Sequence, residues 1–153
     1  MRHVRRRNRG KALCLVLSLV VMAPPPSTPA APVTTTAVQR NVAAKRAQRK
    51  QGARYRFGAA GPRRFDCSGL VVFAFKKAHR PLSVRTARQM WHLGRRIRRS
   101  QLRRGDIVFT WNRNHVGLYL GHGKYVHAPG KRRRVVVEAL PKRGHGFVGA
   151  VRP

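Results

Sequence analysis

Acidic residues are nearly absent from this chain of 153 residues, which has 3 Asp and Glu against 35 Lys and Arg. The formal net charge is +32, so the chain repels itself and is attracted to anionic surroundings. Nucleic acid, anionic lipid and the acidic polymers of a bacterial wall are the candidate surroundings. Charge alone does not choose among them.

Cysteine is also scarce. The chain has 2, Cys14 in an apolar run near the N-terminus and Cys67 in the stretch "RFDCSGLVVFAF". If the N-terminal run is removed, Cys67 is the single thiol, which excludes an intramolecular disulfide. In an exported protein, such a thiol links a dimer, lies inert in the core, or reacts. With so few cysteines and carboxylates, neither a zinc site nor any other cofactor is expected.

The apolar run near the N-terminus is shorter than the roughly 20 residues that a membrane-spanning helix needs. It follows the basic stretch "MRHVRRRNRGK" and precedes "PPPSTPAAP", an order of segments that predicts a secretory signal peptide over residues 1–30. An uncleaved short anchor is the alternative. We then expect a flexible segment over residues 31–36 and one domain over residues 37–153, with no stable membrane insertion once the signal is removed.

Beyond residue 36 the pattern changes from helical to strand-like. The alanine-rich residues 37–51 predict a basic helix that ends at Gly52, with a solvated linker as the alternative. After a glycine-containing loop, a second helix is expected to begin at Cys67 with Asp66 as its N-cap, and residues 84–97 predict a short helix and a turn. Strands are expected over residues 106–111, 115–121, 124–128, 134–140 and 146–153. Helices followed by an antiparallel sheet indicate an α+β fold.

Cys67 is the candidate nucleophile. A helix that begins there directs unpaired backbone N–H groups at the sulfur, which favours the thiolate. The thiol also needs a base, and His115 and His127 lie in successive predicted strands. A two-residue turn between those strands would place the two imidazoles on opposite faces. A three-residue loop over residues 121–123 instead pairs Gly117 with His127 and places both imidazoles on one face, and the glycines at its ends favour this version.

This arrangement predicts a triad in which Cys67 attacks, His115 transfers the proton and His127 orients His115. A ring nitrogen of His115 should then lie within about 4 Å of the sulfur. The remaining histidines of the domain are expected at the surface: His79, His92, His122 and His145.

Five segments in order closely resemble the NlpC/P60 family of cell-wall cysteine peptidases: "YRFGAAGPRRFDCSGLVVFAF", "SVRTARQM", "LRRGDIVFT", "HVGLYLGHGKYVHAPG" and "FVGAVRP". The pair "DCSGL" and "HVGLYLG" is the most specific part of the match. The resemblance implies a papain-like α+β fold, with the cysteine at a helix N-terminus packed against an antiparallel sheet. It also implies hydrolysis of peptidoglycan stem peptides, typically at the bond between D-γ-glutamate and the diamino acid.

The same resemblance assigns roles to single residues. It implies that Cys67 is the nucleophile, His115 the base and His127 the third polar member, and that Tyr55 assists the oxyanion site or substrate binding. It places Asp106 in a structural turn. Four further positions match residues that line the substrate groove: Asp66, Ser68, Arg85 and Gln89. For Asp66, a role as helix cap and nothing more is the alternative.

We therefore expect a secreted, wall-associated peptidoglycan endopeptidase, with stem peptides as substrate and anionic wall polymers as partners. One alternative is an amidase or acyltransferase that uses the same Cys–His site. Another is a non-catalytic wall-binding protein in which the basic runs "KRRRVVV" and "GRRIRRS" are the function. Nucleic acid is not an expected partner, because the basic runs lack interleaved aromatic residues for base stacking and because the chain is expected to be exported. The oligomeric state is left open.

Overall fold

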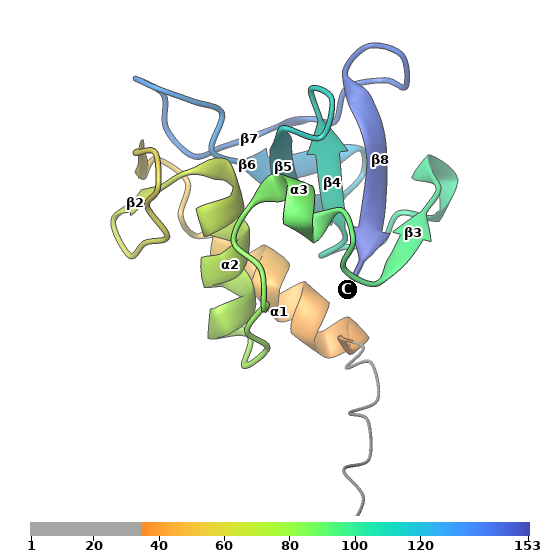
Figure 1. The fold of residues 1–153 in the computed structure, drawn as a ribbon, viewed down its shortest axis with the longest axis horizontal. Helices are drawn as coiled ribbons and strands as arrows, with labels where there is room; N and C mark the ends of the chain where they lie inside the picture. Colours follow the sequence, from red (N-terminus) through yellow and green to blue (C-terminus); the bar gives the residue numbers. More distant parts are fainter. Residues whose placement is uncertain (1–34) are drawn as a thin grey trace, which may run out of the picture. The chain divides into compact units, whose positions relative to one another are not determined.

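The computed structural model describes residues 35–153, so the expected signal peptide and Cys14 lie outside the described residues. The described chain has the α+β fold predicted from the sequence, with helices packed on a six-stranded antiparallel sheet (Figure 1). Helix α1 (Ala37–Gln48) packs on α2 (Cys67–Lys77), and both contact the sheet. None of the helices within residues 35–153 is long and apolar enough to cross a membrane.

The sheet has the order β3-β8-β4-β5-β6-β7, with antiparallel neighbours throughout. Its strands are β3 (Arg95–Ile97), β4 (Ile107–Thr110), β5 (His115–Gly121), β6 (Lys124–His127), β7 (Val136–Ala139) and β8 (Phe147–Arg152). The five predicted strands are confirmed, whereas β3 lies where a turn was expected. A parallel pair, β1 (Arg54–Tyr55) and β2 (Arg64–Phe65), lies within the expected loop. The remaining elements are the short helix α3 (Ala87–Met90) and the 3₁₀ turn η1 (Arg99–Gln101).

Helix α1 forms as predicted, but it ends earlier. Thr36 and Gln39 form a capping box at its start, which satisfies two backbone donors. The helix ends at Gln48 rather than at Gly52, because Gly52 donates its N–H to the carbonyl of Val135 in a distant segment. A face of small residues lets the helix approach α2 closely: Ala43, Ala44 and Ala47, all fully buried. The solvated-linker alternative is therefore wrong.

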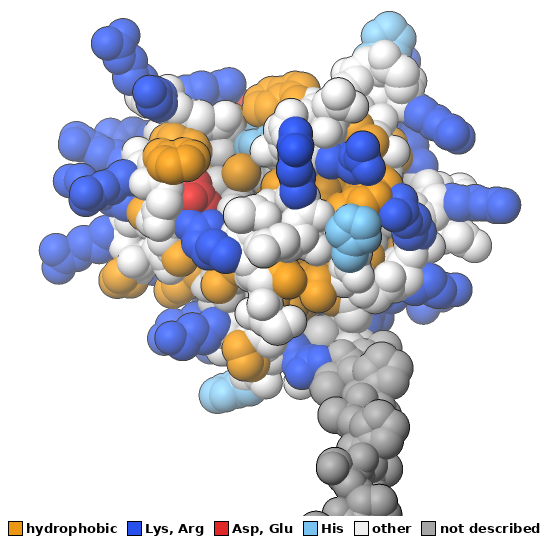
Figure 2. Space-filling view, viewed as in Figure 1, with side chains coloured by type: hydrophobic (Ala, Val, Ile, Leu, Met, Phe, Trp, Pro, Cys, Tyr) orange, Lys and Arg blue, Asp and Glu red, His pale blue; other side chains and the backbone are white. Residues whose placement is uncertain are grey.

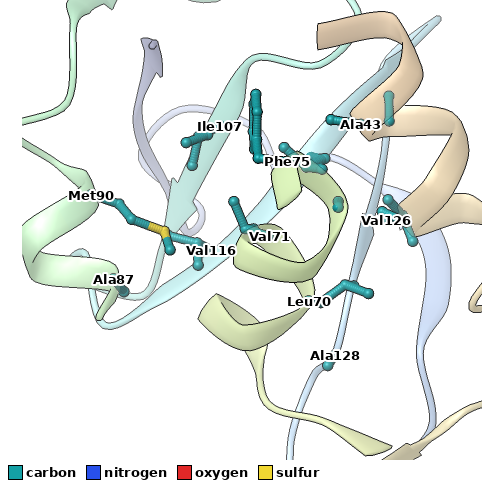
Figure 3. Packing of buried hydrophobic residues seen from close by; sticks show 14 of the residues in the cluster. Ala43, Leu70, Val71, Phe75, Ala87, Met90, Ile107, Val116, Val126 and Ala128 are labelled. Carbon is teal, nitrogen blue, oxygen red and sulfur yellow. The ribbon is translucent and has the colours of Figure 1, made fainter. Parts of the chain in front are cut away.

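The main core lies between the helices and the sheet (Figure 3). Leu70, Val71 and Phe75 of α2 are fully buried, and they belong to the same cluster as Val116 of β5 and Val126 of β6. Burial of such side chains stabilises the fold by about 2 kcal/mol each. The packing fixes α2 against β5, and so it holds the first residue of the helix near the start of the strand.

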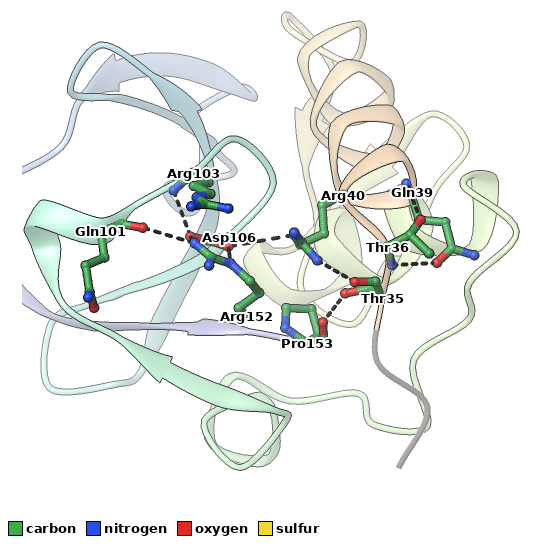
Figure 4. Close-up of polar contacts among 9 residues, drawn as sticks. All are labelled: Thr35, Thr36, Gln39, Arg40, Gln101, Arg103, Asp106, Arg152 and Pro153. Atoms are coloured by element: carbon green, nitrogen blue, oxygen red, sulfur yellow. Dashed lines mark hydrogen bonds and ion pairs between the residues drawn. The ribbon is translucent and has the colours of Figure 1, made fainter. Parts of the chain in front are cut away.

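Asp106 is structural, as expected, and it lies beside both ends of the described chain (Figure 4). Its fully buried carboxylate accepts two hydrogen bonds from Arg152 of β8, at 2.8 and 2.7 Å, and Arg40 Nε of α1 lies 4.0 Å away. Thr35 donates its hydroxyl to the carbonyl of Pro153. Thr35 was expected in a flexible segment, but these contacts hold it in place.

Candidate active site

Cys67 is the first residue of α2, and its side chain is partly buried. Asp66 caps the helix by accepting a hydrogen bond from the N–H of Gly69 at 2.6 Å, as predicted. Gly69 is required here because a Cβ at this position would lie 2.1 Å from the carbonyl oxygen of Ala59. The backbone N–H of Val116 hydrogen-bonds to the sulfur, which joins the helix N-terminus to the second residue of β5.

Burial raises the pKa of the Cys67 thiol above its ordinary value, because the thiolate is poorly solvated there. The backbone N–H of Val116 opposes this shift, the Asp66 carboxylate adds to it, and the N–H groups of Ser68 and Cys67 oppose it. The N–H groups of the helix terminus thus act in the predicted direction, but burial outweighs them. The resting cysteine is therefore a neutral thiol at pH 7.

His115 and His127 form a direct hydrogen bond, with 2.7 Å between Nε2 of His115 and Nδ1 of His127. Both residues are buried, with 4% and 1% of their surface exposed. The pairing of Gly117 with His127 is the register predicted from the sequence. The three-residue loop predicted over residues 121–123 is wrong, because Gly121 pairs with Lys124 across a two-residue turn. A bulge between Tyr119 and Gly121 then shifts the register by one.

Both imidazoles are neutral at pH 7. Burial, together with the positive charge that His127 can carry, lowers the pKa of His115 to about 3. Burial also lowers the pKa of His127, although the hydrogen bond and charge of Glu138 act in the opposite direction. Neutral rings can share one proton between facing nitrogens, which is what their direct hydrogen bond requires.

Glu138 extends the histidine pair, although it is not among the site residues predicted from the sequence. Its Oε2 lies 3.1 Å from Nε2 of His127, and its Oε1 accepts a hydrogen bond from Arg133 at 3.0 Å. Because Glu138 pairs with Tyr125 across β6 and β7, it is a diagonal neighbour of His127 on the same face. The available signal was its position in the strand after His127, in a chain with 3 acidic residues.

Trp111 covers one side of His115 and was also missed. The two ring centroids are 4.6 Å apart, and Trp111 is 52% exposed. It begins a run of three residues with left-handed backbone, continued by Asn112 and Arg113, between β4 and β5. Bulky residues rarely adopt this conformation, so the turn holds the indole at some conformational cost. No sequence pattern indicated that this turn would fold back over the histidine.

Three of the predicted groove residues form one cluster beside Cys67. The guanidinium of Arg85 donates to both oxygens of Asp66, at 3.1 and 2.7 Å, and to Ser68 Oγ at 2.8 Å. Asp66 also accepts hydrogen bonds from Ser68 Oγ and from the Gly58 N–H. With all these donors and the helix cap, its carboxylate is fully engaged. This favours a capping and bracing role for Asp66 over contact with a substrate amine.

A profile of the NlpC/P60 family matches residues 52–146, which contain Cys67, His115, His127 and Glu138. The chain belongs to the NlpC/P60 family. It is 39% identical over 107 residues to the murein DD-endopeptidase MepH of Escherichia coli (strain K12), an alignment that covers 65% of this chain and 40% of MepH. It is 34% identical over 88 residues to the gamma-DL-glutamyl hydrolase of Bacillus subtilis (strain 168), which covers 54% of this chain and 20% of that protein. The chain thus spans less than half the length of either relative.

A solved NlpC/P60 structure shares the fold. The P60 domain of an antigen from M. avium subspecies paratuberculosis is 28% identical and has a TM-score of 0.66. The superposition covers 74% of this chain and 93% of that domain.

Two residues to which the NlpC/P60 resemblance assigns a role remain: Tyr55, at the oxyanion site or in substrate binding, and Gln89, the fourth groove residue. Tyr55 lies within electrostatic range of the thiol: burial raises its phenol pKa, and negative charge on Cys67 and Asp66 raises it further. The Gln89 side chain instead accepts from the N–H groups of Arg85 and Thr86 and forms a capping box at α3. Gln89 thus shapes the segment that carries Arg85 and does not join its cluster. No group of side chains that could hold a metal ion occurs within residues 35–153.

Proposed function

We propose that this NlpC/P60 chain is an extracytoplasmic cysteine endopeptidase that hydrolyses peptidoglycan stem peptides. The observation that carries the proposal is the hydrogen-bonded pair of His115 and His127, together with the hydrogen bond from the backbone N–H of Val116, the residue after His115, to the Cys67 sulfur. Similarity to a murein DD-endopeptidase supports peptidoglycan as substrate and a location outside the cytoplasm. For the scissile bond we propose the one between D-γ-glutamate and the diamino acid, with anionic wall polymers as further partners.

Glu138 determines which nitrogen of each imidazole carries a proton. An ionised carboxylate only accepts hydrogen bonds, so Nε2 of His127 donates to Glu138 and Nδ1 of His127 accepts. Nε2 of His115 then donates to that Nδ1. Nδ1 of His115 is left with a free lone pair, and we assign it as the base that faces the Cys67 thiol.

The reaction follows from these assignments. The Cys67 thiol transfers its proton to Nδ1 of His115, and the sulfur attacks the amide carbon. The resulting oxyanion is stabilised by the backbone N–H of Cys67 and by the Tyr55 hydroxyl. The C–N bond breaks as His115 returns the proton to the leaving amine, which leaves a thioester. Water, deprotonated by His115, attacks the thioester and restores the thiol.

Trp111 assists the step in which His115 becomes charged. The imidazole is neutral at rest and turns into a cation only when it accepts the thiol proton. The indole beside it attracts a cation by about 0.5–2 kcal/mol, a contribution absent from the neutral resting state. The contact therefore lowers the activation barrier of the proton transfer, because it stabilises the charged His115 and not the resting enzyme.

Digestion of purified peptidoglycan by the wild type and by Cys67→Ala tests the proposal. Mass spectrometry should find new peptide ends with the wild type and none with the variant. Identical products from both proteins would reject a catalytic Cys67 and favour the non-catalytic wall-binding alternative. Products with a free sugar lactyl end or an exchanged acyl group would instead indicate an amidase or an acyltransferase.

A second candidate substrate is a γ-glutamyl polymer. The similarity to a gamma-DL-glutamyl hydrolase and the net charge of +32 both favour such a polyanion. Its bond has the same γ-amide chemistry as the proposed stem-peptide bond. Incubation with poly-γ-glutamate, followed by measurement of polymer length, separates the two candidates.

A further inference from the structure

Four arginines and a tyrosine line a cavity of about 320 Å³: Arg54, Tyr55, Arg132, Arg133 and Arg134. Tyr55 connects this cavity to the active site, because Tyr55 pairs with Phe65 of β2, two residues before Cys67, and packs against the same core cluster as Cys67. The run Arg132–Arg134 begins five residues after His127 and precedes β7, which carries Glu138. Tyr55 therefore forms the part of the cavity nearest to the thiol, and the segment that precedes β7 forms the part at the β6–β7 edge of the sheet.

The backbone on both sides of this cavity is held by a ladder of hydrogen bonds. Tyr55 donates its N–H to the carbonyl of Arg133 at 3.0 Å, and Val135 donates to Ala53 at 2.8 Å. Arg54 and Arg134 form a bridge between these two segments. The guanidinium of Arg134 also donates to the carbonyl of Gly52. These hydrogen bonds fix the backbone that carries the arginines, and we call the paired segments 52–55 and 132–135 the arginine platform.

The positive charge of this platform is largely uncompensated. The three acidic residues of the chain are all among residues 35–153, and each is engaged: Asp66 with Arg85, Asp106 with Arg152, and Glu138 with Arg133 and His127. Within the described chain, Arg54 and Arg132 have no carboxylate within ion-pair distance. Several guanidinium groups crowded at one cavity repel one another, and a bound anion relieves that repulsion.

We propose that this cavity binds a carboxylate of the substrate close to the bond that is cleaved, so that the site selects acidic peptides over their amidated forms. The inference rests on the proposed function and names the substrate class for the same active site. A guanidinium donates two parallel hydrogen bonds to a carboxylate, which gives geometric selection as well as attraction. A cavity of this size holds one such group and its neighbouring atoms.

Two peptides with the same scissile γ-glutamyl bond test the inference, one with free α-carboxylates and one with these converted to carboxamides. The variant is Arg54→Gln/Arg132→Gln, which spares Arg133 and its contact with Glu138. The matched control is Arg98→Gln/Arg143→Gln, which removes the same charge next to β3 and β8, at the opposite side of the sheet. Hydrolysis of the amidated peptide also reports whether each variant is correctly folded.

We expect the cavity variant to lose roughly tenfold or more in kcat/KM on the acidic peptide and less than about twofold on the amidated one. The control should change both by similar, small factors. Equal losses on the two peptides, or no loss on either, would overturn the assignment of the cavity. If the wild type cleaves neither peptide, the proposed function fails instead.

A binding measurement separates carboxylate recognition from general attraction to anions. Fluorescence anisotropy of the labelled acidic peptide is followed with Cys67→Ala, with inorganic phosphate as competitor. We expect the peptide to bind more tightly than its amidated form, and phosphate to displace it only at far higher concentration than unlabelled acidic peptide does. Displacement by phosphate at the same concentration would identify a general anion site and contradict the proposal.

Discussion

Glu138 acts on the reaction through His127, which it contacts at 3.1 Å, while Arg133 holds its other oxygen. We predict that Glu138→Gln lowers kcat by about tenfold and leaves KM nearly unchanged, because an amide can both donate and accept and so allows the wrong tautomer. Glu138→Leu, which removes the acceptor, should lower kcat further. Steady-state kinetics over a range of pH checks this. A loss confined to KM would show that Glu138 contributes only to substrate binding.

The indole of Trp111 gives a second prediction for a single side chain. Trp111→Leu should lower kcat by about 2- to 30-fold, which corresponds to the loss of a cation–π contact with the His115 cation. Trp111→Phe keeps an aromatic face and should retain most of the activity. If the two variants were equally impaired, the indole would be needed for its size rather than for its interaction with charge.

The raised pKa of the Cys67 thiol predicts an alkaline reactivity profile. The thiolate fraction grows as pH rises toward a pKa above the ordinary value of 9.0, so alkylation by iodoacetamide should still be accelerating at pH 9. His115, with a pKa of about 3, contributes no further step between pH 5 and 9. The rate of mass gain at Cys67, measured across that range, tests this. A plateau already reached at pH 7 would instead indicate a thiolate–imidazolium pair at rest.

At the scale of elements, the β5–β6 hairpin aligns the two histidines, and a bulge sets that alignment. Deleting Lys124 removes a residue from β6 and should turn His127 to the opposite face, because a shift of one residue reverses every side chain of a strand. Hydrolysis should be abolished. Deleting Gly121 removes the extra residue from β5 instead, so Gly117 can still pair with His127 across the same two-residue turn.

Peptidoglycan digestion and thermal unfolding of the two deletion variants provide the comparison. Activity should survive, at least in part, only when Gly121 is deleted. Retained activity in the Lys124 deletion would show that the hairpin re-forms its register independently of strand length.

Elements with a regular pattern of apolar residues could be predicted from the sequence. Elements whose ends or pairing depend on contacts with distant segments could not. The helix at Cys67 and the pairing of Gly117 with His127 were predicted correctly, although a bulge in β5 rather than a three-residue loop produces that pairing. The predicted end of α1 was wrong because the N–H of Gly52 donates to the carbonyl of Val135, more than eighty residues away, a contact that no local pattern encodes. Strands of two or three residues, such as β1 and β3, are too short to show alternation. Glu138 required knowledge of the β6–β7 register.

For the whole molecule, Asp106 is the main polar tie between α1, the start of β4 and the C-terminal strand. Asp106→Ala would leave the guanidinium groups of Arg40 and Arg152, which are 8% and 11% exposed, without their buried partner. We predict a loss of about 3–5 kcal/mol in the free energy of unfolding. Urea denaturation measures it, with Glu138→Leu as the comparison, because that carboxylate is 40% exposed and should contribute far less to stability. Equal losses in the two variants would contradict the tie.

Figure 2 shows basic side chains projecting along the left and right edges of this face, with little acidic surface between them. The reason is that the chain has three acidic residues, and each of them is paired with an arginine. A protein surface with this many separate positive charges binds a polyanion through many weak ionic contacts, which break and re-form one at a time. If the substrate is a polyanion, we expect the protein to diffuse along it without dissociating, so that the search for a cleavable bond depends on one-dimensional diffusion rather than on repeated association from solution.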